Sequence, residues 1–260
     1  MRKSGIVTVI TALIFVLVLL SITFCRKDKP VNTKVNLYLS DAPAYFKAVN
    51  IDIQKILVKY DGSGNEQEVK LNHPGVYNLL DFSNGYDTLL GSITVPPGKI
   101  SQIHIMFGQN NSFVNDSENV TLNLAPEIEN GMIISTDQKV TEEKIFNLWI
   151  DFDASRSVIS SGNRNYSLRP VVRVFSEDVK GGIRGVVIPE DRKPFVYAIS
   201  GSDSIGTITD SKGRFYIKGV AGGIYKMRFI PQKPGVQQAV IDSVEVKEDS
   251  LKYIGTIVIN

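Results

Sequence analysis

The stretch VNIDIQKILVKY, residues 49–60, decides the fold class of this chain. Its apolar side chains alternate in one phase up to Ile53 and in the opposite phase from Ile56 onward. A period of two residues is that of a β-strand, in which successive side chains point to opposite faces of a sheet. The change of phase predicts a β-bulge near Gln54 and Lys55, where one extra residue enters the strand.

The same alternation recurs along the rest of the first two thirds of the chain. It is found in KVNLYLSD (34–41), KISQIHIMF (99–107), FNLWIDFDA (146–154) and LRPVVRVF (168–175). Between such runs lie turn sequences, of which DGSGN (61–65) predicts a hairpin directly after the first strand. No segment after the first 25 residues keeps an apolar period of 3.6, so we predict an all-β protein.

The composition changes at SEDVKGG (176–182), a polar stretch that ends in two glycines and predicts a domain boundary. About seven short strand patterns follow it, which is typical of a β-sandwich. DSKG (210–213) predicts a turn that needs a positive φ at Gly213, with Phe215 and Ile217 pointing into a core. We therefore predict two tandem β-sandwich domains, residues 33–178 and 181–260, after an N-terminal signal or anchor helix.

The chain begins with two basic residues, Arg2 and Lys3, and continues with an uncharged apolar run from Gly5 to Phe24. This is the pattern of a secretory signal. The run is also about long enough to span a bilayer as a helix, which takes roughly 20 residues. Cys25 follows it, and as the only cysteine it excludes an intrachain disulfide.

In this context Cys25 resembles the lipid-attachment cysteine of bacterial lipoproteins. Residues 22–23 match the lipobox of their signals, whereas Phe24 stands where those signals usually have Gly, Ala or Ser. We predict a lipoprotein signal over residues 1–25 with lipid on Cys25, and an uncleaved membrane anchor is the alternative. Residues 26–32 predict a polar tether. It lacks the acidic run that resembles a surface-export signal of Bacteroidetes lipoproteins, which leaves the face of the outer membrane open.

Charge and motifs argue against several functions. The chain has 29 Lys and Arg against 27 Asp and Glu, and its basic residues are scattered, so we expect no nucleic-acid partner. Neither His73 nor His104 has zinc-peptidase spacing, and His104 falls in the outward phase of its strand. GxSxG, phosphate-loop and dinucleotide motifs do not occur. We therefore expect no enzyme, no metal and no cofactor.

Two parts of the chain resemble known families. Residues 33–178 resemble the bacterial envelope family called domain of unknown function 4382, for which no activity is known. The stretches that carry this resemblance are LYLSDAPAYFKAVNIDI, NLLDFSNG, PPGKISQIHIMF and IDFDASRSVISSGNRNYSLRPVVRVF. Residues 181–260 resemble the carboxypeptidase regulatory-like domain through GIRGVV and GTITDSKGRFYIKGVAGGIY. The second resemblance implies a transthyretin-like sandwich, grouped with carbohydrate-binding-like folds, that serves surface and outer-membrane proteins as an accessory.

The polar cluster WIDFDASR (149–156) is the candidate site. A period of two places Trp149, Asp151 and Asp153 on one face of a strand. Together with Asp41, the two carboxylates can hold a hard cation such as calcium, or bind glycan hydroxyls beside Trp149. The alternative is structural, with Asp41 capping a turn and the other two carboxylates paired to arginine. The candidate arginines are Arg156, Arg169 and Arg173.

Four short stretches resemble the Asp-Ser/Thr-aliphatic O-glycosylation signal of exported Bacteroidetes proteins. The hydroxyl residues in them are Thr88, Ser204, Ser243 and Ser250.

Together these patterns predict a non-enzymatic, membrane-anchored cell-envelope lipoprotein, placed in the outer membrane, that acts as a binding or structural module. Its expected partners are the membrane, through lipid on Cys25, and a glycan or an envelope protein. The alternative is a glycan-binding accessory protein for polysaccharide capture, which needs an exposed aromatic platform from Trp149, Tyr38 or Tyr166. An enzyme of unrecognised type is a third hypothesis, which a pocket of convergent carboxylates with raised pKa values would favour.

Overall fold

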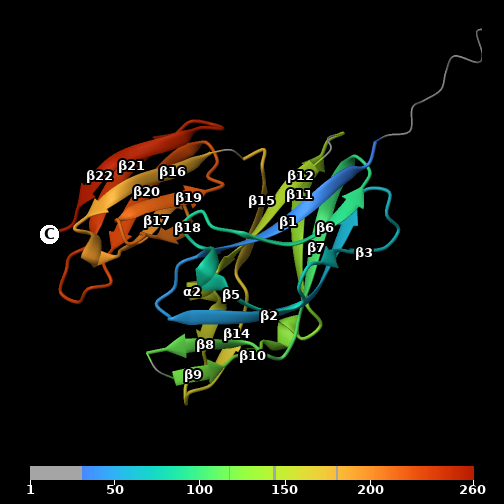
Figure 1. Ribbon diagram of the computed structural model, residues 1–260, viewed down its shortest axis with the longest axis horizontal. Helices are drawn as coiled ribbons and strands as arrows, with labels where there is room; N and C mark the ends of the chain where they lie inside the picture. Colours follow the sequence, from blue (N-terminus) through green and yellow to red (C-terminus); the bar gives the residue numbers. More distant parts are fainter. Residues whose placement is uncertain (1–30, 117, 143–144, 180) are drawn as a thin grey trace, which may run out of the picture. The chain divides into compact units, whose positions relative to one another are not determined.

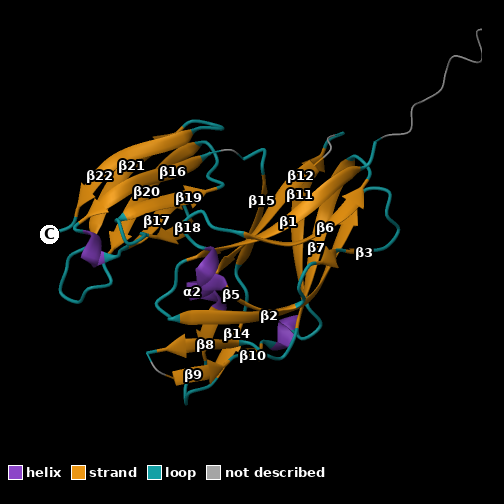
Figure 2. Ribbon diagram, in the orientation of Figure 1, coloured by secondary structure: helices purple, strands orange, loops and turns teal. Residues whose placement is uncertain are grey.

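The computed structural model describes residues 31–260, except residues 117, 143–144 and 180. Asn32–Asn260 form one compact unit that is built almost wholly from β-strands (Figures 1 and 2), which confirms the predicted all-β class. The predicted signal or anchor helix, Cys25 and residues 26–30 of the predicted tether lie outside the described residues. In the part of the chain that is described, no helix has the length and apolar character needed to cross a membrane.

Three sheets contain the strands of the first part of the unit. The first sheet has the order β15 (Val172–Ser176), β12 (Ile145–Asp153), β1 (Thr33–Ala42), β6 (Thr88–Val95) and β4 (Lys70–Leu71). The second has the order β11 (Met132–Val140), β7 (Gly98–Phe107), β2 (Ala48–Tyr60), β8 (Ser112–Asn115) and β9 (Glu118–Thr121), with β3 (Gln67–Glu68) and β5 (Gly75–Asn78) also paired to β2. The third has the order β10 (Asn123–Leu124), β14 (Tyr166–Leu168) and β13 (Val158–Ser160).

Two further sheets contain the remaining strands, which are orange and red in Figure 1. One has the order β19 (Arg214–Lys218), β16 (Gly182–Ile188) and β22 (Leu251–Val258). The other has the order β18 (Asp203–Ile208), β17 (Phe195–Ser200), β20 (Gly223–Ile230) and β21 (Ala239–Val246). The described helices are single turns, namely η1 (Leu79–Phe82), η2 (Pro126–Ile128), α2 (Ala154–Ser157) and η3 (Glu190–Arg192).

The unit contains two hydrophobic cores. The first gathers inward side chains between Val35 and Leu168, and the second gathers those between Ile183 and Ile259. The burial of these apolar side chains is the main favourable contribution to folding. Two cores agree with two sandwiches, although Asn32–Asn260 form a single compact body and the boundaries at 178 and 181 stay a prediction.

The local predictions hold at several places. The register of β2 against β7 shifts between Ile53 and Lys55, which confirms the β-bulge. The hairpin after β2 is present as the pairing of β2 with β3. Gly213 has φ +71°, and Phe215 and Ile217 are buried in the second core, as the DSKG turn predicted.

β1 is the central strand of its sheet and positions the candidate site. Val35, Leu37 and Leu39 face the first core and are fully buried. The other face of β1 is also largely covered by the protein, since Asn36 and Ser40 on that face are buried. β12 pairs with β1 in parallel, which requires a long connection between them and gives no local sequence signal. This pairing brings residues more than a hundred positions apart into contact.

Candidate functional site

The parallel pair of β1 and β12 brings the predicted site residues to neighbouring positions. Ser40 lies opposite Asp151 in the register, and Asp41 lies opposite Phe152, one residue further along each strand. Asp153 is the last residue of β12. Asp151 and Asp153 therefore lie in the same phase of β12, at the end of the sheet. Asp41 lies on the neighbouring strand β1, in the opposite phase.

Trp149 is enclosed by other side chains and is only 8% exposed. Its ring stacks on Tyr38 at 5.3 Å and on Phe175 at 5.5 Å between centroids. Its Nε1 donates a hydrogen bond of 2.7 Å to Asp87, and the Lys218 ammonium lies 3.8 Å from the ring centre. The sequence reading of Trp149 as an exposed sugar platform is wrong, because an enclosed ring offers no free face.

Asp151 is held in a partly buried ion pair with Arg173. The Arg173 Nε lies 2.6 Å from one carboxylate oxygen of Asp151, and the Ser40 hydroxyl donates to the other at 2.7 Å. The same guanidinium donates to the carbonyl oxygens of Lys218 and Gly219, at 3.0 and 2.7 Å. Arg173 therefore links the first core to a strand of the second, and both oxygens of Asp151 are engaged.

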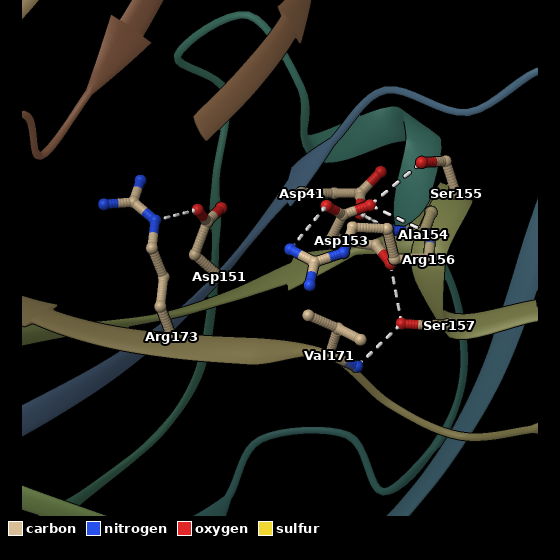
Figure 3. Close-up of polar contacts among 9 residues, drawn as sticks. All are labelled: Asp41, Asp151, Asp153, Ala154, Ser155, Arg156, Ser157, Val171 and Arg173. Atoms are coloured by element: carbon tan, nitrogen blue, oxygen red, sulfur yellow. Dashed lines mark hydrogen bonds and ion pairs between the residues drawn. The ribbon is translucent and has the colours of Figure 1, made fainter. Parts of the chain in front are cut away.

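Asp153 caps the short helix α2 (Figure 3). One of its carboxylate oxygens accepts hydrogen bonds of 3.0 Å from the Arg156 backbone N–H and from the Ser155 hydroxyl. The Arg156 guanidinium lies 3.9 Å from the other oxygen. Burial raises the pKa of Asp153, against these hydrogen bonds. A helix cap is the ordinary use of an aspartate at this position.

Asp41 is the most enclosed carboxyl of the cluster, at 4% exposure. Its Oδ1 accepts a hydrogen bond of 3.1 Å from the Ala154 backbone N–H, whereas its Oδ2 has no partner. Burial raises the pKa of Asp41 well above its usual value, and the charge of Asp151 raises it further. Enclosure in a medium of low polarity therefore favours the neutral acid.

These contacts follow the structural alternative given by the sequence. Asp151 pairs with Arg173 and Asp153 with Arg156, while the third candidate, Arg169, pairs with Glu127 instead. Within the described residues, no group of three or more His, Cys, Asp or Glu side chains is arranged to hold a metal ion. Each carboxylate of the cluster thus has at least one partner within the protein, and a cation role stays a prediction.

Other predicted residues have ordinary environments. His104 lies on β7, where its Nδ1 is 3.3 Å from Glu66 and its Nε2 is 3.0 Å from the Asn130 carbonyl oxygen. Among the four O-glycosylation candidates, Ser243 is exposed and the remaining three are half-buried. The glycosylation itself stays a prediction.

A groove of about 520 Å³ presents a different set of aromatic side chains. It lies along the sheet of β19, β16 and β22. The cross-strand register places Arg184 opposite Tyr216 on one side and opposite Tyr253 on the other. This row is in the phase opposite to Phe215 and Ile217, so it points away from the second core. Residues lining the groove are Asn84, Tyr86, Arg184, Gly185, Val186, Asp210, Arg214, Phe215, Tyr216, Leu251 and Tyr253.

The turn that carries Tyr86 is fixed against β19 by Asn84. The Asn84 side chain donates to the Arg214 carbonyl oxygen at 3.2 Å and accepts from the Tyr216 backbone N–H at 2.7 Å. Gly85 has φ +83°, and a Cβ there would lie 2.6 Å from the Tyr216 ring. The absence of a side chain at Gly85 lets the turn lie directly on that ring.

The two arginines of the groove differ in their partners. Arg214 forms an ion pair of 2.8 Å with Asp210. Arg184 forms no ion pair with an acidic side chain among the described residues, and its guanidinium lies 5.8 Å from the centre of the Tyr253 ring. The lining therefore carries one guanidinium that no internal carboxylate neutralises, beside exposed aromatic rings. Such a surface can stack on a ring and bind an anion.

Sequence reasoning missed this groove. Strand alternation does give the outward phase of Tyr216, because Phe215 and Ile217 point inward. It gives no sign that Tyr86 and Tyr253 converge on the same surface, since they come from segments more than a hundred residues apart. The platform candidates Tyr38 and Tyr166 are only half-buried, but Tyr38 stacks on Trp149 and Tyr166 packs against another aromatic ring.

The fold and the enclosed polar cluster define an all-β protein whose first core is organised around β1 and β12. Residues 32–170 match the family described as "Domain of unknown function (DUF4382)", which covers more than half of the 260 residues. The chain belongs to this family. Among curated proteins, none matches the chain.

Solved structures share only a low similarity with the chain. The Bacillus anthracis TIE protein is 12% identical with a TM-score of 0.26, over 88% of this chain and 34% of that one. A streptococcal ancillary pilin is 9% identical with a TM-score of 0.25, over 87% and 68% of the two chains. The shaft pilin SpaA from Lactobacillus rhamnosus GG is 9% identical with a TM-score of 0.24, over 89% and 97%. Similarity at this level carries no argument about function.

Proposed function

We propose that this chain is a non-enzymatic, membrane-anchored lipoprotein of the bacterial cell envelope, placed in the outer membrane, and that it acts as a binding or structural module. The observation that carries the non-enzymatic part is the state of the carboxylate cluster. Asp151 is neutralised by Arg173, Asp153 caps a helix, and Asp41 is enclosed. Asp151 and Asp153 line a pocket of about 400 Å³, and burial raises the pKa of Asp153, but their oxygens are engaged by Arg173, Ser40 and the backbone of α2. That engagement supports a structural role over acid–base catalysis.

The anchoring part of the proposal rests on the sequence of the N-terminus. A basic start, an uncharged apolar run and a single cysteine at its end favour lipid attachment at Cys25. We also assign residues 181–260 to the carboxypeptidase regulatory-like domain, with a Bacteroidetes origin for the whole chain. Seven strands around a separate apolar core support that assignment.

The anchoring proposal is tested by intact mass and N-terminal analysis of the full chain expressed in a bacterial host. We expect a mature chain that begins at an acylated Cys25, and an unprocessed chain from Cys25→Ala. Phe24→Gly is the matched control, because it brings the lipobox closer to its usual form and should be processed at least as well. Protease treatment of whole cells then reports the membrane face. A wild-type chain that starts at Met1 without lipid would refute the lipoprotein assignment.

A second candidate function is glycan binding for polysaccharide capture. The groove beside Tyr86, Tyr216 and Tyr253 favours it, because exposed tyrosine rings offer apolar faces with a polar edge. Sugars present the matching surface, with apolar C–H faces and a rim of hydroxyl groups. Binding of the full chain to immobilised polysaccharides tests this function, and loss of that binding in Tyr253→Ala would locate it to the groove.

A further inference from the structure

We propose that the groove along β19, β16 and β22 binds a glycan that carries carboxylate groups, such as a chain of uronic acids, and that Arg184 recognises the carboxylate. The proposal rests on the glycan-binding function above and names its ligand class. It is carried by one juxtaposition: a guanidinium without an internal acidic partner, set between two tyrosines in a cross-strand row.

The charge of the groove favours an anionic ligand. Its lining contains the cations Arg184 and Arg214 and the anion Asp210, which leaves one net positive charge. Asp210 already pairs with Arg214 at 2.8 Å, and it also accepts hydrogen bonds from two backbone N–H groups of its own turn. The remaining charge therefore belongs to Arg184. A guanidinium binds a carboxylate through two parallel hydrogen bonds, which gives both affinity and orientation.

The aromatic side chains favour a ring-shaped ligand beside that carboxylate. Tyr86 is 70% exposed and Tyr253 is 56% exposed, whereas Tyr216 is half-buried beneath the turn at Gly85. Exposed rings that share one surface, unlike ones scattered singly, are a mark of a ligand or partner site. The volume of about 520 Å³ falls within the range of roughly 300–1,000 Å³ that is typical of ligand sites. A uronic acid supplies a pyranose ring for stacking and a carboxylate at its edge.

The groove is also held in shape before any ligand binds. Asn84 fixes the Tyr86 turn through its backbone N–H to the Thr207 hydroxyl, at 2.9 Å, in addition to its two side-chain hydrogen bonds to β19. The row from Tyr216 to Tyr253 is set by the register of a three-stranded sheet. A site that is already organised loses less entropy on binding than one that forms around its ligand.

The test uses the full chain in detergent and two uronate probes, hexagalacturonate and an alginate hexamer, each with its methyl ester. The ester keeps the ring and removes the charge. By calorimetric titration we expect at least one acid to bind more tightly than its ester. Arg184→Gln should weaken binding of the acid about 10- to 100-fold and leave the ester unchanged, as for a charge-assisted hydrogen-bonded pair. Tyr253→Ala should weaken both forms.

Arg164→Gln is the control, since this arginine is also exposed but pairs with Glu118 away from the groove, and it should bind like the wild type. Circular dichroism of each variant checks the fold. Equal binding of acid and ester, both lost in Tyr253→Ala, would overturn the carboxylate assignment and leave glycan binding standing. No binding of either uronate would overturn this proposal, while immobilised neutral polysaccharides would still report on the broader function. Neither outcome bears on lipid attachment at Cys25.

Discussion

Asp41 is a buried carboxyl whose hydrogen-bonding capacity the fold satisfies only in part. Its carboxyl is enclosed at the end of β1, with one oxygen bound to the Ala154 N–H and the other without a partner. Nothing in the sequence SDAPA distinguishes this residue from the exposed turn aspartate that its neighbouring proline suggests. The parallel neighbour β12 and the helix α2 create the enclosure, and both come from more than a hundred residues further along the chain.

We expect Asp41 to make the stability of the protein depend on pH. An unfolded aspartate has a pKa of about 3.9, and burial raises the pKa of Asp41 in the folded protein. Between these two values the folded state binds more protons, so the free energy of unfolding falls as pH rises. The stabilisation that Asp41 contributes is fully present below its pKa in the unfolded chain. It is lost as pH rises through its pKa in the folded protein.

Asp41→Asn removes this titration. Relative to the variant, the wild type should lose stability as pH rises above the unfolded pKa, because ionising the buried carboxyl of Asp41 is unfavourable in the folded state. Urea unfolding at a series of pH values measures the difference. Asp242→Asn is the control, because that carboxylate is 79% exposed in a surface ion pair with Lys226. The prediction would be contradicted if the free energy of unfolding changed with pH in the same way for the wild type and for Asp41→Asn.

At the scale of the element, the turn between β18 and β19 depends on Gly213. Its φ of +71° is one that side chains rarely adopt, and a Cβ there would lie 2.1 Å from the Val187 carbonyl oxygen. Gly62, in the hairpin after β2, has a similar φ of +80° but open space around its Cβ position. The two glycines therefore share a backbone conformation and differ in their surroundings.

Replacing each of these glycines by alanine separates the two effects. Gly62→Ala should cost about 1–2 kcal/mol, the penalty of the left-handed conformation alone. Gly213→Ala should cost about 1–3 kcal/mol more, because the backbone of β16 must move away from the new methyl group. Chemical denaturation of both variants measures these losses. Equal losses would show that β16 yields to the clash without cost.

The element scale is also where the sequence was most informative. The change of phase in residues 49–60 located the bulge of β2. Residues that point to the buried face are apolar, so a change in the apolar pattern shows where an extra residue enters the strand. The strand patterns after residue 181 correspond to β16 through β22. The parallel pairs β1–β12 and β16–β22 had no such signal, since the partner of a parallel strand is set by the rest of the fold.

At the scale of the whole molecule, polar contacts join the two hydrophobic cores. Arg173 binds Asp151 on one side and two carbonyl oxygens at the end of β19 on the other. Lys218 reaches Asp87 at 2.9 Å, and Asn84 bonds to β18 and β19. With so many contacts between them, we expect the cores to unfold together.

Calorimetry of the full chain should therefore show one cooperative transition for the described unit. Asn84→Gly keeps the positive φ of 57° and removes the two side-chain hydrogen bonds, worth about 1–3 kcal/mol together. We expect that transition to broaden or divide in the variant. Asn163→Gly is the control, because Asn163 has φ +51° in an exposed turn far from β19 in the sequence. Two separate transitions in the wild type would refute the coupling.

The sequence alone determined the all-β class, the phase of several long strands and the bulge in β2, because alternation is a local property that burial imposes on neighbouring residues. It also grouped Asp41, Trp149, Asp151 and Asp153 as residues that belong together. Only the tertiary structure decided which partners they contact. Pairing of β1 with β12 enclosed them, and the cross-strand row around Arg184 left a different set exposed. Burial and exposure depend on contacts between segments distant in sequence, and no local pattern encodes them.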